Sequence, residues 1–128
     1  MVNVDLESLL DQHVKITRKL EELFSKLDEG EEVEESEKEI IHLLWKLSII
    51  RRKIKRLFRE ENNYTDDMLT LLEYYSLIGL NDEEELLQRA LSYGSKGHKL
   101  LASRSEELET SINELRELKE TIERLFNP

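Results

Sequence analysis

The sequence of 128 residues contains no cysteine, one proline and four glycines. The lack of cysteine excludes a disulfide-stapled domain and the zinc sites that are built from cysteine thiolates. The scarcity of proline and glycine excludes collagen-like and low-complexity chains. No apolar run approaches the roughly 18 residues of a membrane-spanning helix, and no basic segment followed by an apolar one suggests a secretory signal. We therefore expect a cytoplasmic protein without a membrane partner.

Charged residues, in contrast, make up 38% of the chain, well above the usual quarter or so. There are 29 Asp and Glu residues against 19 Lys and Arg residues, which gives a formal net charge of -10. Glutamine is rare, and this charge-rich, amide-poor composition is typical of thermophile proteins, in which ion-pair networks cost less. A net negative charge of this size also repels nucleic acid at long range.

The apolar residues recur at alternating steps of three and four, which is the spacing of one helix face. No stretch alternates apolar and polar residues as a strand does. The pattern predicts an all-α chain forming a single domain over residues 1–128. Short connections favour antiparallel neighbours, so we expect an up-down-up-down four-helix bundle. The predicted helices span about residues 4–28, 36–61, 65–93 and 97–126.

Capping signals set most of these boundaries. Ser36 and Glu39 have the spacing of a capping box, which predicts that the second helix begins at Ser36. Thr65 is a hydroxyl N-cap for the third helix. Gly79 has the form of a C-terminal glycine, so we expect the third helix to be broken near residues 79–81.

One alternative architecture remains open from the sequence. Residues 81–126 could form one long helix with Gly94 and Gly97 inside it, at a cost of roughly 1 kcal/mol for each glycine. The fold would then be a three-helix coiled coil with a long C-terminal helix. The spacing alone does not decide whether residues 94–97 turn or continue.

The second helix carries two apolar stripes, although a helix on the outside of a monomeric bundle needs only one. Ile41, Trp45 and Ile49 recur every four residues on the face opposite the main stripe, and Arg52 and Arg56 continue that face. Tryptophan and arginine are favoured at interface hot spots. We therefore predict a non-catalytic interaction module that uses these five residues to form a homodimer or to bind another protein.

A basic segment follows directly and suggests a second hypothesis, that the chain is associated with nucleic acid. We favour it less because the whole chain is acidic. An antiparallel first helix would place Asp11, Glu7 and Asp5 near the arginines. The last helix should bring its acidic residues to the same end, which suggests internal neutralisation instead; these residues are Glu114, Glu117, Glu120 and Glu123. The possible nucleic-acid contacts are Arg51, Arg52, Lys53, Lys55, Arg56 and Arg59.

The remaining polar residues give little support for chemistry. His13 lies within the apolar seam of the first helix, where a polar residue often fixes register. Glu39 and His42 have the Glu-x-x-His spacing of di-iron bundles, but no second copy follows. An acidic metal site near residues 28–39 is a third hypothesis. No pair of nucleophile and base is evident, so we expect no catalytic residue, metal, cofactor or small-molecule substrate.

Overall fold

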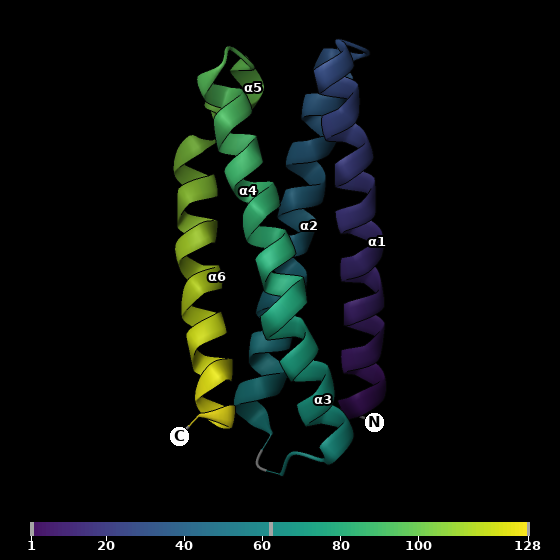
Figure 1. Cartoon of the computed structure of the whole chain (residues 1–128), viewed down its shortest axis with the longest axis vertical. Coiled ribbons are helices and arrows are strands. Elements are labelled where there is room, and N and C mark those ends of the chain that lie inside the picture. The colour runs from purple at the N-terminus through teal and green to yellow at the C-terminus, as the bar shows by residue number, and fades with distance from the viewer. Residues whose placement is uncertain (1, 62, 128) are drawn as a thin grey trace.

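The computed structural model describes residues 2–61 and 63–127, with side chains from Asp5 onward, and it is all-α. The described residues contain no strand. The elements are α1 (Val2–Glu29), α2 (Val33–Glu60), α3 (Asp66–Tyr74), the π-helical turn η1 (Tyr75–Gly79), α4 (Leu80–Ser95), α5 (Lys99–Ala102) and α6 (Ser105–Phe126). They form four long rods that pack side by side, namely α1, α2, the continuous α3–η1–α4, and α6. The chain runs along them up, down, up and down (Figure 1).

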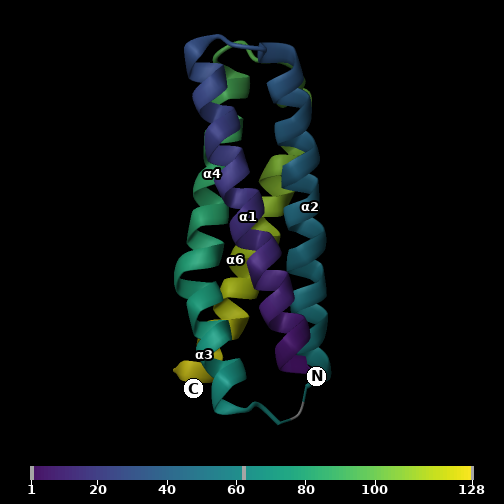
Figure 2. The ribbon, with the colours of Figure 1, turned by 90° about the vertical axis from the view of Figure 1, so that its right-hand side faces the viewer.

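One continuous cluster of mainly leucine and isoleucine side chains, with Phe24, Tyr75 and Ala90, fills the space between the rods. α1 packs along α2, and α4 packs along α6, as the two views of the ribbon show (Figures 1 and 2). The seam predicted for the first two helices lies in this core, since Leu20, Ile40 and Ile54 are fully buried. The sequence-based expectation of an all-α protein with packed helices is therefore confirmed.

The predicted start of the second helix at Ser36 is wrong. α2 begins at Val33, and Ser36 is buried inside its first turns. Gly30 and Glu32 both have positive φ, at 72° and 43°, so the connection from α1 is very tight. The acidic residues that follow do not delay the helix, because carboxylates in the first turn interact favourably with its dipole.

The predicted break near residues 79–81 is also wrong. Thr65 caps α3 as expected, with its side chain accepting a hydrogen bond from the Met68 backbone N–H at 3.2 Å. Gly79, however, has helical torsions (φ -58°, ψ -52°) and lies at the end of η1. The third rod therefore continues from α3 into α4, because a π-helical turn absorbs the change of register without ending the helix.

The chain does turn after α4, so the long C-terminal helix of the three-helix alternative is wrong. Gly97 has φ 111°, a conformation that favours glycine. The last segment is not one helix over residues 97–126 either. The short helix α5 ends at Ala102, and α6 begins at Ser105 and packs back along α4.

Candidate functional site

The site is built on the side of α2 that faces away from the core. Leu43 and Leu47 point inward and are buried, whereas the side chain of Trp45 is 57% exposed. Ile41 and Ile49, one turn to either side, are half-buried. We call this surface the outward face of α2; its residues are Glu34, Lys38, Ile41, Trp45, Ile49, Arg52 and Arg56.

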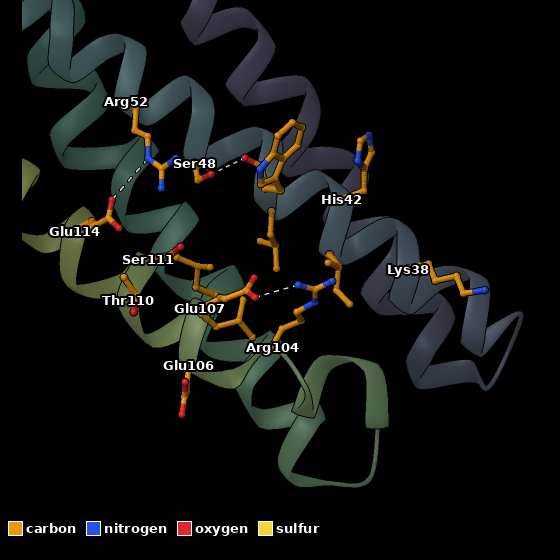
Figure 3. A pocket seen from close by; sticks show the side chains of 15 residues that line it. Lys38, His42, Ser48, Arg52, Arg104, Glu106, Glu107, Thr110, Ser111 and Glu114 are labelled. Atoms are coloured by element: carbon orange, nitrogen blue, oxygen red, sulfur yellow. Dashed lines mark hydrogen bonds and ion pairs between the residues drawn. The ribbon is translucent and has the colours of Figure 1, made fainter.

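A groove of about 580 Å³ runs along one side of this face, between α2 and α6 (Figure 3). Its apolar lining includes Ile41, Leu44 and Trp45 from α2 and Leu108 from α6. Polar side chains from the two helices face each other across it, as the close view shows. The groove is open to solvent and long enough to follow several turns of both helices.

A second groove of about 450 Å³ lies on the other side of the same face, between α1 and α2. Ile16 of α1 and Ile49 and Ile50 of α2 supply its apolar surface, and Trp45 lines this groove as well. The tryptophan therefore forms a ridge between two hollows. Helices pack by placing the ridges of one into the grooves of another. A ridge between two grooves is therefore a surface onto which a partner helix can pack.

Ion pairs hold the walls of the first groove. Arg104 Nη1 lies 2.9 Å from Glu107 Oε1 on α6, and Arg52 Nε lies 3.9 Å from Glu114 Oε2 across the groove (Figure 3). The ring of His42 stacks on that of Trp45, with centroids 6.0 Å apart. With these contacts in place, Trp45 is still 57% exposed.

The basic segment beyond Arg52 remains free on the surface. Within the part of the chain that the structure describes, no ion pair within 4.0 Å involves Lys53, Lys55, Arg56 or Arg59. Arg52 pairs with Glu114 of α6 and not with Asp11 of α1. The neutralisation expected from α1 is therefore not made by direct ion pairs, whereas Glu114 of the last helix does lie beside Arg52, as expected.

Arg51 behaves differently from its neighbours and is removed from the proposed nucleic-acid surface. Its side chain is buried and forms a short ion pair with Glu83 of α4. The other carboxylate oxygen of Glu83 lies 3.0 Å from His13 Nε2 of α1. A buried carboxylate thus joins three rods, and its partners offset the large cost of desolvating the charges.

Tyr75 of η1 closes this polar cluster. Its ring meets that of His13 edge to face, with centroids 5.6 Å apart. Burial is the main cause that raises the pKa of Tyr75 well above 10, and the charge of Glu83 adds to it while Arg51 opposes it. Neither the Tyr75 hydroxyl nor Arg51 Nη2 has a hydrogen-bond partner among the described residues.

The sequence placed one member of this cluster, His13, in the seam of the first helix. It assigned Arg51 to the possible nucleic-acid surface and singled out neither Glu83 nor Tyr75. Glu83 precedes Leu86 and Leu87 by three and four residues, which places it on the apolar stripe of α4. That spacing was the available signal.

A second exposed apolar patch lies on the third rod. Tyr74, Leu77 and Ile78 are 40%, 55% and 47% exposed. The inward positions of this rod are Tyr75, Ser76 and Gly79 instead. Neither of the two grooves beside α2 reaches this patch.

The structure offers no further support for chemistry at the histidines. In residues 2–61 and 63–127 no group of three or more His, Cys, Asp or Glu side chains could hold a metal ion. Glu39 and His42 are both exposed on α2. None of the described helices is both long and apolar enough to span a bilayer.

Comparison of the chain with protein-family models, with curated proteins and with solved structures finds no match. The function therefore has to be inferred from the site itself.

Proposed function

We propose that the chain is a non-catalytic protein-interaction module whose docking surface is the outward face of α2. The observation that carries this proposal is the position of Trp45, which is 57% exposed on a ridge between two grooves. A large aromatic side chain gains most from burial in a partner, and the arginines beyond it are typical hot-spot residues. Apolar ridge, flanking grooves and charged rim together form one interaction surface.

Exposed apolar residues are ordinary when they are scattered, but this set is contiguous. Ile41, Trp45 and Ile49 occupy three successive turns, so a partner helix could cover them with residues at matching spacing.

Photo-crosslinking from position 45 tests this proposal. A photoreactive phenylalanine analogue replaces Trp45 in the full chain, which is then irradiated in an extract of the source cells. We expect a discrete adduct with a protein, whether a second copy or another chain. Excess unmodified chain should compete the adduct away, whereas excess Trp45→Glu chain should not.

The matched control places the same analogue at Gln88, an exposed position on α4 that lines neither groove. Equal labelling from the two positions, or no competition by unmodified chain, would refute the proposed surface.

An adduct that nuclease removes would instead favour the second candidate, a nucleic-acid contact. That candidate rests on the four exposed cations that make no ion pair within the described residues, Lys53, Lys55, Arg56 and Arg59.

A further inference from the structure

We infer that the partner on the outward face of α2 is the same face of a second copy, packed antiparallel around a two-fold axis at Trp45. This inference rests on the proposed function and adds the identity and orientation of the occupant. It follows from the way in which charge is distributed along α2.

The two ends of α2 have opposite charge. Residues 31–39 hold six acidic residues and one lysine, whereas residues 51–59 hold six basic residues and no acid. All but Glu37 and Arg51 of these charged side chains are exposed. An antiparallel copy therefore brings the basic end of each helix over the acidic end of the other.

The register that aligns the two tryptophans also aligns the other residues of the face. Arg56 and Glu34 lie eleven residues on either side of Trp45, so Arg56 of each copy meets Glu34 of the other. Both are about 16 Å along the axis from Trp45. Ile41 and Ile49 lie four residues on either side of Trp45, so Ile41 of each copy meets Ile49 of the other. The outward face of α2 is thus complementary to itself.

One pair of like charges remains in this register, since Arg52 lies opposite Lys38 of the second copy. Each of them already has a carboxylate within its own chain. Lys38 Nζ lies 3.3 Å from Glu34 Oε1, and Arg52 Nε lies 3.9 Å from Glu114 Oε2. The carboxylates of Glu34 and Glu114 therefore lie beside the two cations and offset their repulsion.

A parallel dimer is the competing arrangement. It would bring the carboxylates along α6 of one copy toward the lysines beside α1 of the other. It would also place Arg52 opposite Arg52, and Arg56 opposite Arg56, of the second copy. Those like charges lie on the contact face, whereas α6 and α1 flank it at a greater distance. Attraction falls with distance and is screened by salt, so the directly opposed charges decide the orientation.

The two grooves leave room for a partner on both sides of the Trp45 ridge. They are lined by 15 and 8 residues and share only Trp45. The charge of -10 on each copy opposes association at long range, so the measurements belong at about 0.15 M salt, where screening acts over about 8 Å.

A charge-swap series with light scattering tests the inference on the purified chain. We expect a dimer, with its dissociation constant raised at least about tenfold by Arg56→Glu or by Glu34→Arg alone. The double variant with both substitutions should restore dimerisation, because the two-fold axis re-forms each pair with its charges exchanged. Circular dichroism of every variant separates weakened association from unfolding.

The control for the swap is the Arg116–Glu84 pair, which joins α6 to α4 at 3.0 Å and lines neither groove. Exchanging its charges should leave the mass unchanged.

Trp45 is the only tryptophan, so its fluorescence must shift to the blue as the dimer forms. A dimer without that shift would place the contact elsewhere, for example on the Tyr74, Leu77 and Ile78 patch, and would overturn the inference.

The absence of native cysteine allows the orientation to be tested directly. Mixing the Arg56→Cys and Glu34→Cys chains with a short thiol crosslinker should join position 56 of one chain to position 34 of the other. Crosslinks of each variant to itself alone would indicate a parallel dimer and refute the inference. A strictly monomeric chain that still crosslinks to another protein from position 45 would refute the inference and leave the proposed function standing.

Discussion

Arg51 and Arg52 are consecutive residues of α2, yet they belong to two different regions of the molecule. Arg51 points inward and pairs with Glu83 in the buried cluster. Arg52 points outward, is 62% exposed and lies at a loose 3.9 Å from Glu114. An arginine is therefore held in a buried ion pair at position 51 and is exposed on the surface at position 52. The comparison shows that α2 serves both as a core helix and as a contact surface.

Removing one carboxylate from each region tests whether the two ion pairs contribute differently to the free energy of unfolding. Glu83→Gln should lower the free energy of unfolding by about 3–5 kcal/mol, because Arg51 stays buried without a compensating charge. Glu114→Gln should lower it by less than about 1 kcal/mol, since that pair is exposed. Urea denaturation at neutral pH measures both values. Equal losses would mean that burial does not distinguish the two ion pairs.

The apolar faces of α2 offer a second pair of substitutions. Leu47 is fully buried, so Leu47→Ala should cost about 2–5 kcal/mol of the free energy of unfolding. Trp45→Ala removes a larger side chain but should cost the monomer less than about 1 kcal/mol, because most of that side chain faces water. Thermal unfolding at a concentration where the chain is monomeric checks both. A large loss for Trp45→Ala would show that this residue belongs to the core.

Much of this contrast could be predicted from the sequence, and part of it could not. The second apolar stripe was visible because helical periodicity is a local signal, and it placed Trp45 and its isoleucine neighbours on one face. The different roles of Arg51 and Arg52 were not visible. The partner of Arg51 lies 32 residues further along the chain, and only packing brings it there.

The smallest expected effect lies within the buried cluster. Tyr75→Phe should change the free energy of unfolding by less than about 1 kcal/mol at pH 7, because the hydroxyl has no hydrogen-bond partner among the described residues to lose. At alkaline pH the variant should be the more stable chain. The raised pKa of Tyr75 means that the folded state resists ionisation, so stability falls as pH rises above about 10.

Denaturation of the wild-type and variant chains at pH 7 and at about pH 11 measures this difference. The other tyrosines titrate in both chains, so the comparison isolates Tyr75. A loss of several kcal/mol at pH 7 would show that the hydroxyl does make a stabilising hydrogen bond, and a parallel decline of both chains at high pH would show that its ionisation is not resisted.

The sequence by itself determined the helical class, the four rods and the double stripe on α2. These features follow from residue spacing along one helix, which needs no knowledge of what lies opposite. Tertiary structure alone decided the early start of α2, the continuity of the third rod through η1, and the burial of Glu83 between His13 and Arg51. Those outcomes depend on the free energy of packing residues that are far apart in the chain, since a buried charge persists only where distant partners stabilise it.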